Sequence, residues 1–277
     1  MHNIALSWRQ AAVLTVALAV MYLLLRVAAS SMARKVAPFA REACVIAGLY
    51  SLWQLAGELS VTGTAGAIGR AEWIERVEHD LWLPPESDLQ HLVLPHPLLA
   101  QACNWYYATM HFAALFGLLL WLFVRHRDRY RTVRTTIIGL TVSCLLIQLV
   151  PVAPPRLLPG YVDLAAQYGQ SVYTAFGNAG IDQLSAMPSV HVGWAVLVGG
   201  AVIWASPSRW RWWALAHPVI TIFVVVVTAN HFWLDGIVAV ALLALTVAAQ
   251  LAWRRLRAGR RVITPVLARP ESVAVSD

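Results

Sequence analysis

Long apolar runs separated by short polar segments dominate the pattern along the chain. The runs hold about 17 to 27 residues each, and a helix needs roughly 20 residues to cross a bilayer. Because lipid offers the backbone no hydrogen bonds, segments of this kind must be helical. The pattern therefore predicts an all-α, polytopic membrane helix bundle with seven spans, which are Gln10–Val27, Ala43–Val61, Leu98–Val124, Val133–Val150, Ser189–Ser206, Trp213–Asn230 and Gly236–Trp253.

The composition supports a membrane protein. Apolar residues make up 59% of the 277 residues and charged residues only 13%, whereas about a quarter of the residues of a typical soluble protein are charged. The alternative, in which the apolar runs are buried core helices of a soluble protein, is therefore disfavoured.

The first span has an alternative interpretation as a cleaved signal sequence. A signal peptide carries its positive charge in front of the apolar run and a small-residue cleavage site behind it. Here only Arg9 precedes the run, and Arg34, Lys35 and Arg41 follow it. We therefore expect a retained anchor whose N-terminus lies outside the cell.

The net charge of +7 suggests a nucleic-acid partner at first sight, but the basic residues are sorted by loop. Of the 21 Lys and Arg residues, all except Arg9, Arg70, Arg76 and Arg156 lie at the end of the first span, in the loops after the first, third, fifth and seventh spans, at the start of the fourth span, or in the C-terminal tail. This positive-inside pattern places those segments in the cytoplasm. We expect a multi-pass protein of the cell membrane with membrane lipids, and no nucleic acid, as partners.

No internal repeat or low-complexity linker divides the chain. We expect an anchor span and cytoplasmic loop in residues 1–42, a membrane core in residues 43–253 and a basic, partly disordered cytoplasmic tail in residues 254–277. Between the second and third spans, Ala71–Leu83 has apolar residues at helical spacing between acids, which predicts an amphipathic helix in the membrane interface. Such a helix is either a lid over a lipid site or a passive surface element.

The three cysteines, Cys44, Cys103 and Cys144, each lie inside a predicted span. Their sequence pattern contains no Cys-x-x-Cys pair, so neither a zinc site nor a disulfide framework is indicated. We expect them to act as small apolar residues in helix packing.

Three polar groups carry the candidate chemistry, and the first is Pro151-Val152-Ala153-Pro154-Pro155-Arg156, directly after the fourth span. Prolines end the helix and stiffen the chain that follows it. The planar fork of an arginine binds two phosphate oxygens at once. Arg156 is thus a candidate phosphate ligand, with a lipid-facing interfacial arginine as the alternative.

The second group is Ala186-Met187-Pro188-Ser189-Val190-His191, at the start of the fifth span. Pro188 suits the first turn of a helix, and the free N–H groups there form an anion site to which Ser189 adds a hydroxyl. His191 lies within the same turn. The alternative is a simple helix cap.

The third group runs from Thr228 to Asp235 and contains His231. His231 and Asp235 are four residues apart, so they share one face if the segment is helical. A carboxylate on one imidazole nitrogen fixes the tautomer and leaves the other nitrogen free to attack. The alternative is a cap beside an interfacial histidine. The predicted topology brings all three groups to the same membrane face.

Together these motifs resemble the type 2 phosphatidic-acid phosphatase superfamily of membrane enzymes, over roughly Ala43 to Trp253. The superfamily pattern is Lys-x6-Arg-Pro, then Pro-Ser-Gly-His, then Ser-Arg-x5-His-x3-Asp. The resemblance implies a six-helix phosphatase-like core plus one extra N-terminal span. It also implies a set of roles: His231 is the nucleophile, Asp235 orients it, His191 protonates the leaving alcohol, and Arg156 and Ser189 hold the phosphate.

Several residues depart from that pattern. Leu149 stands at the position of the first Lys, Leu157 at that of the Pro, Val190 at that of the Gly and Val225 at that of the second Arg. These losses are similar to the inositolphosphotransferase branch, which contains the fungal inositol phosphorylceramide synthases. They leave open which residues supply the missing positive charge.

The third span adds a second candidate site. Asn104, Tyr107 and His111 are spaced three and four apart, which places them on one helix face, and the segment around them resembles a stretch common in the same branch. They are candidates for an acceptor or head-group site. Polar contacts between helices are the alternative.

The resemblance implies a lipid-phosphate phosphatase or phosphotransferase that acts at the extracytoplasmic face through a phosphohistidine, on a lipid phosphate or phospholipid. Asp235 is the only acid beside the three motifs, and Mg²⁺ needs clustered carboxylates, so we expect no metal and no cofactor. Two alternatives remain: a transporter or channel with polar groups along a path, and a cytochrome with histidine haem ligands. The acceptor, water or an alcohol, and the oligomeric state stay open.

Overall fold

The computed structural model of the protein describes residues 6–61, 66–170 and 182–266, and these residues form helices and loops without a β-strand. The helices are α1 (Trp8–Val27), α2 (Ser31–Val61), α3 (Ala67–Asp80), α4 (Glu86–Val93), α5 (Pro97–Arg125), α6 (Arg127–Gln148), α7 (Leu164–Gln167), α9 (Val190–Ala205), α10 (Ala216–Val227) and α11 (Trp233–Val266). Short 3-10 helices lie at η1 (Pro155–Leu157), η2 (Asp182–Leu184) and η3 (Arg209–Leu215). The predicted all-α membrane bundle is confirmed.

A helix covers most of each predicted span, but the boundaries differ. The second helix begins at Ser31 rather than Ala43, and the last continues to Val266 rather than ending at Trp253. The segment predicted to start as a helix at Trp213 begins in the 3-10 turn η3. The part of the tail that was predicted to be disordered lies mostly beyond residue 266, outside the described residues.

Among the described helices, four segments are long and apolar enough to cross a membrane: Trp8–Val27, Pro97–Arg125, Arg209–Val227 and Trp233–Arg257. The protein is therefore embedded in a membrane. Helix α9 is apolar but has only 16 residues, which corresponds to about 24 Å at 1.5 Å per residue. That all seven predicted segments cross the bilayer stays a prediction.

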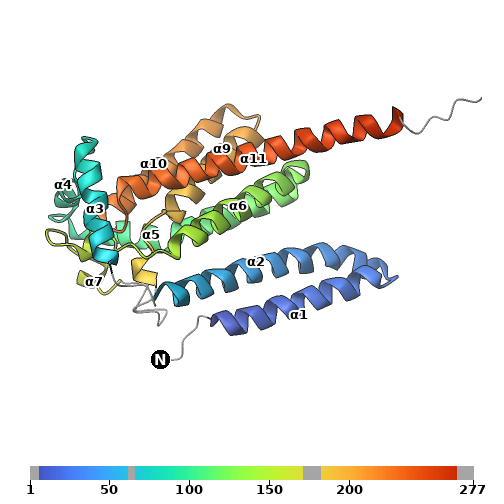
Figure 1. The fold of residues 1–277 in the computed structure, drawn as a ribbon, viewed down its shortest axis with the longest axis horizontal. Coiled ribbons are helices and arrows are strands. Elements are labelled where there is room, and N and C mark those ends of the chain that lie inside the picture. Colours follow the sequence, from blue (N-terminus) through green and yellow to red (C-terminus); the bar gives the residue numbers. More distant parts are fainter. Residues whose placement is uncertain (1–5, 62–65, 171–181, 267–277) are drawn as a thin grey trace, which may run out of the picture.

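The long helices lie side by side along the long axis of the molecule (Figure 1). Helices α5, α6, α9 and α11 pack around a core that includes Leu122, Leu140 and Cys144, and α10 packs against α9 and α5. A Cβ on Gly139 of α6 would lie 2.7 Å from Cγ2 of Thr246 on α11, so this glycine allows the two helices their close approach. Helix α1 packs on α2, and α2 packs on α6.

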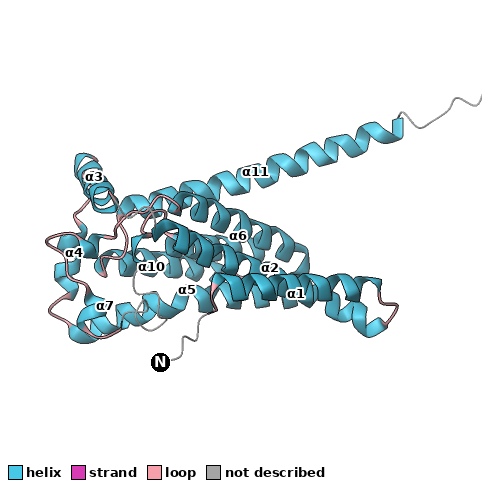
Figure 2. Ribbon diagram, turned by 60° about the horizontal axis from the view of Figure 1, so that its bottom comes forward, coloured by secondary structure: helices cyan, strands magenta, loops and turns pink. Residues whose placement is uncertain are grey.

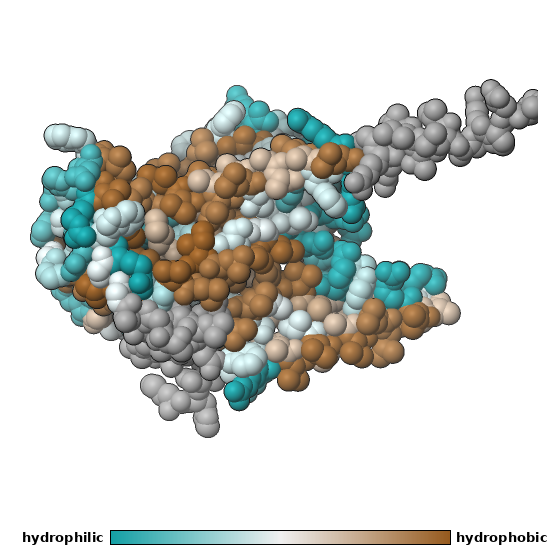
Figure 3. All heavy atoms as spheres, viewed as in Figure 1, coloured by the Kyte–Doolittle hydropathy of each residue, from teal (hydrophilic) through white to brown (hydrophobic). Residues whose placement is uncertain are grey.

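The surface is apolar along the helices and hydrophilic at their ends (Figure 3). Helix α1 buries only Ala11 and exposes large apolar side chains, among them Val13 and Leu24. Exposure of apolar residues along whole helices is expected where lipid, rather than water, surrounds the protein.

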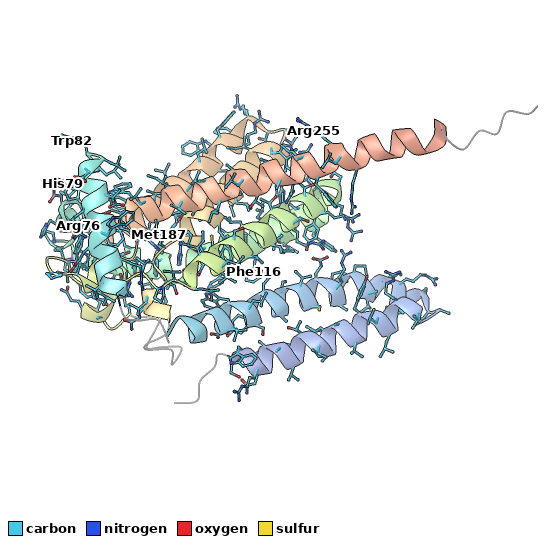
Figure 4. The ribbon with its side chains drawn as sticks, viewed as in Figure 1. Arg76, His79, Trp82, Phe116, Met187 and Arg255 are labelled. Carbon is cyan, nitrogen blue, oxygen red and sulfur yellow. The ribbon has the colours of Figure 1, made fainter. Side chains whose placement is uncertain are left out.

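Helices α3, α4 and α7 gather at one end of the bundle, as both ribbon views show (Figures 1 and 2). Met187, Arg76 and His79 lie at this end, and Arg255 lies toward the other (Figure 4). The helix predicted for Ala71–Leu83 is α3, which starts earlier, at Ala67, and ends at Asp80.

The side of α3 that packs against the rest of the protein carries apolar residues and one acid. It consists of Ala67, Ala71, Ile74 and Glu78, while Trp73 is exposed. An acid on the buried side of an amphipathic helix needs a partner there.

Candidate active site

The three motifs meet at the end of the bundle that carries α3 and α4, and backbone hydrogen bonds join them. The Arg156 N–H donates to the Ala229 carbonyl at 2.9 Å, and the Ser189 N–H donates to the Asp235 carbonyl at 3.0 Å. Val152 pairs with Ser185 in an isolated parallel bridge. Segments far apart in the sequence are thus fixed against one another, as the topology predicted.

His231 lies just before α11 and is only 4% exposed. Its Nδ1 lies 2.8 Å from the Ala186 carbonyl and 3.3 Å from Oδ2 of Asp235. Both neighbours are acceptors when the carboxylate is ionised, so the network assigns the proton to Nδ1. Nε2 then carries the lone pair, and it has no hydrogen-bond partner within the described part of the chain.

Asp235 is fully buried in the first turn of α11. Besides facing His231, its Oδ2 accepts the Phe232 N–H at 2.9 Å. This N–H is one of the donors that a helix start leaves without an intrahelical acceptor. The Asp235 carboxylate therefore caps the N-terminal end of α11 and also orients the His231 imidazole.

His191, on the first turn of α9, lies close to His231. Its ring centroid is 5.5 Å from that of His231. Tyr107 stacks on it at 4.3 Å, and His111 lies edge-on at 4.2 Å, both from α5. Two of the three residues predicted on the third span thus hold the ring of His191 from one side.

Asn104, the third of these residues, lies nearer the start of α5 than Tyr107 and His111 and has different contacts. Its Nδ2 donates to the Leu164 carbonyl at 3.1 Å and to Oε1 of Gln170 at 2.9 Å. Asn104 therefore fastens the segment around α7 to α5. The proposed acceptor or head-group role of Asn104, Tyr107 and His111 stays a prediction.

Arg156 lies in η1 with its side chain 3% exposed. Its Nη1 donates to Oδ1 of Asn230 at 2.7 Å, and its Nε pairs with Oδ2 of Asp163 at 3.3 Å. Asn230 directly precedes His231, so the guanidinium lies beside the histidine segment. Sequence reasoning missed both partners, although the adjacency of Asn230 to His231 was a usable signal.

Ser189 is the N-cap of α9, since its Oγ accepts the Val192 N–H at 3.3 Å. The hydroxyl proton remains available to donate to an anion. Pro188 was predicted in the first turn of this helix, and that was wrong: α9 begins at Val190, and Pro188 precedes the cap after a cis peptide bond.

The positions of the missing motif cations differ in their surroundings. Val225 is 2% exposed on α10, and its carbonyl accepts the N–H groups of Asn230 and His231 at 3.0 and 3.2 Å. With Tyr107 and His191 it lines a small pocket. Leu149, at the end of α6, is 41% exposed. Arg70 of α3 reaches the first motif, where its Nε donates to the Pro151 carbonyl at 2.6 Å.

No group of three or more His, Cys, Asp or Glu side chains within the described ranges is arranged to hold a metal ion. That the protein works without a metal ion stays a prediction, which activity in the presence of a chelator tests. Cys44, Cys103 and Cys144 are unpaired, and the latter two are buried in helix contacts.

The site thus holds a buried histidine, oriented by a carboxylate and next to a segment that binds an arginine, at one end of a membrane-embedded bundle. A family model described as the PAP2 superfamily matches residues 72–249, which is more than half of the chain. The protein belongs to the PAP2 superfamily. No curated protein and no solved structure matches the chain. The family match confirms the predicted superfamily and, with the apolar helices, supports a membrane phosphatase-type function. The inositolphosphotransferase-like branch stays a prediction.

Proposed function

We propose that the protein is a lipid-phosphate phosphatase or phosphotransferase that works at the extracytoplasmic face through a phosphohistidine at His231. The observation that carries the proposal is that the two nitrogens of the His231 imidazole have different surroundings. Nδ1 is held by the Ala186 carbonyl and Asp235, while the buried Nε2 has no partner among the described residues. A nucleophile held by a third group in this way is ready to attack.

In the proposed first step, Nε2 of His231 attacks phosphorus and forms an N–P bond. The ester P–O bond breaks on the opposite side, and the leaving alkoxide takes a proton from His191. Arg156 and the N–H groups at the start of α9 stabilise the charge on the remaining phosphate oxygens. Asp235 stabilises the positive charge that develops on the imidazole.

In the proposed second step, water or an alcohol attacks the phosphohistidine. Its proton passes to His191, the new O–P bond forms, and the N–P bond breaks to restore His231. Water makes the protein a phosphatase, and an alcohol makes it a phosphotransferase. Both use the same groups, so the acceptor depends on what the membrane supplies at the site.

The test of this function is phosphate release by the purified protein from a panel of lipid phosphates, in detergent with EDTA. We expect release from at least one lipid monoester, unaffected by the chelator, because the proposed machinery consists of side chains alone. Inhibition by EDTA that Mg²⁺ reverses would contradict it. If no monoester reacts, phospholipid donors with alcohol acceptors, inositol first, test the transferase; failure of both, with solute flux through liposomes, favours a transporter.

The orientation of the site has its own test. His79 near the candidate site and Arg255 near the other end are both exposed (Figure 4). On intact cells, a membrane-impermeant maleimide should label His79→Cys, and it should label Arg255→Cys only after permeabilisation, because the positive-inside rule puts Arg255 in the cytoplasm. The unmodified protein controls for Cys44, Cys103 and Cys144. The reverse labelling pattern would place the site on the cytoplasmic face.

A further inference from the structure

Three carboxyl groups from three helices cap the first turn of α11. Asp235 accepts the Phe232 N–H at 2.9 Å, Glu86 of α4 accepts the Trp233 N–H at 3.2 Å, and Glu78 of α3 accepts the Leu234 N–H at 2.6 Å. Successive donors at a helix start usually bind water or a single capping side chain. Here helices α3 and α4, at the end of the bundle (Figure 1), supply two of the three acceptors.

These carboxyl groups are too deeply buried for all of them to carry a charge. Glu78 is 4% exposed, Glu86 2% and Asp235 0%. Neighbouring buried carboxylates repel one another, and each loses its hydration, so one of them holds a proton. Oε2 of Glu78 has no donor partner in the described ranges, and the Glu86 carboxyl is its hydrogen-bonding neighbour. A proton on Glu78 shared with Glu86 satisfies both groups.

The surrounding charges agree with a neutral Glu78. Burial, the hydrogen bond to Glu86 and the negative charge of Asp235 raise the pKa of Glu78 to about 10. The Tyr161 hydroxyl donates to Glu75 at 3.1 Å and to Glu86 at 3.4 Å, and the pKa of Tyr161 is itself raised by burial and by these two acids. Glu86 accepts hydrogen bonds from the Tyr161 hydroxyl and the Trp233 N–H, and the Glu78 proton adds a third donor.

We propose that the Glu78–Glu86 carboxyl pair is a positioning device that fixes the first turn of α11, and thereby the orientation of Asp235 and His231. The inference rests on the proposed function of His231. The hydrogen bonds of the pair go to the backbone of α11 and to Tyr161 rather than to the imidazole. The pair acts through the N–H groups of Trp233 and Leu234, which directly follow Phe232, the residue whose N–H binds Asp235.

The kinetic test compares Glu78→Ala, Glu78→Gln and the control Glu72→Gln, an exposed glutamate on the same helix. The probe is phosphate release from phosphatidic acid in mixed micelles. A displaced catalytic group costs about 10²-fold for about 1 Å, so we expect Glu78→Ala to lower kcat by about 10- to 100-fold with little change in KM. Glu78→Gln should stay within about threefold of the unmodified protein, because glutamine keeps an acceptor for Leu234 and a donor for Glu86. Wild-type kcat in Glu78→Ala, or equal losses in both variants, would overturn the proposal.

A second readout needs no substrate. A carboxyl whose pKa is raised by folding adds stability at low pH and loses it as pH rises toward the folded-state pKa. The titratable groups that act on Glu78 are Glu86 and Asp235. Tyr161 and Glu75 reach Glu78 only through Glu86, and His231 only through Asp235. All of these groups are unchanged in Glu78→Gln. Between pH 5 and pH 9, Tm of the unmodified protein should fall by at least about 5 °C more than Tm of Glu78→Gln. Parallel Tm profiles would overturn the shared proton.

The tautomer of His231 separates positioning from plain stability, again without a substrate. We expect ¹⁵N NMR, with His231→Ala for assignment, to show the Nδ1–H tautomer in the unmodified protein and in Glu78→Gln, and a changed signal in Glu78→Ala. An unchanged signal in Glu78→Ala would overturn the proposal. If His231→Ala turns over normally, the proposed function fails, while the Tm and tautomer results still decide the role of the carboxyl pair. If Glu78→Ala does not fold, Glu78→Gln still decides through kcat and Tm.

Discussion

Replacing His231 by alanine lowers phosphate release by about 10⁴-fold or more, which corresponds to about 5.5 kcal/mol of transition-state stabilisation. The expected loss is this large because the variant removes the only group to which the phosphoryl is bonded between the two steps. The neighbouring His191 lies with its ring 5.5 Å from that of His231, and Tyr107 and His111 pack against it.

The matched control for this substitution is His79→Ala. His79 also lies at the site end of the bundle, but its side chain is 88% exposed. This variant should release phosphate at the rate of the unmodified protein. Turnover by His231→Ala at more than about a tenth of that rate would remove the nucleophile from the account.

Replacing Asp235 by asparagine lowers kcat by about 10² to 10³-fold. Oδ2 of Asp235 accepts both the Phe232 N–H and the Nδ1–H of His231. An asparagine amide therefore either keeps both contacts without the negative charge or places its NH₂ group against Nδ1, which favours the tautomer with its proton on Nε2. That tautomer has no lone pair with which to attack. The Ala186 carbonyl, 2.8 Å from Nδ1, still favours the productive tautomer, so the loss is smaller than the about 10⁴-fold expected where a carboxylate alone sets the tautomer.

The control for this variant is Asp80→Asn, an acid whose side chain is 84% exposed. The measurements are kcat for the two variants and the ¹⁵N NMR signal of His231. We expect the NMR signal of Asp235→Asn to show a mixture of tautomers. Wild-type kcat together with an unchanged tautomer would show that the Ala186 carbonyl alone orients the ring.

The sequence predicted the helices and the convergence of the motifs because both depend on local, regular patterns. Apolar runs of membrane length predict helices wherever they occur. The motifs lie at the ends of neighbouring spans, so the alternation of the chain across the membrane is enough to bring Arg156, His191 and His231 to one face.

The parts that sequence reasoning missed depend on long-range contacts. Glu78 has the spacing of a solvent-facing acid in an amphipathic pattern, and only the approach of α4 and α11 makes its burial understandable. The role of Asn104 depends on Leu164 and Gln170, which no periodicity links to it. Pro188 matched a helix-start preference, but Ser189 is the N-cap, so the helix starts at Val190, two residues after the proline.

The most direct test of the His231 prediction is to trap the phosphoenzyme. Purified protein is mixed with ³²P-labelled phosphatidic acid in EDTA, stopped in alkaline detergent, which preserves an N–P bond, and digested for peptide mapping. The account predicts label on the peptide that contains His231 in the unmodified protein and in His79→Ala, and no label in His231→Ala. Label on another residue, or label that survives in His231→Ala, would contradict it.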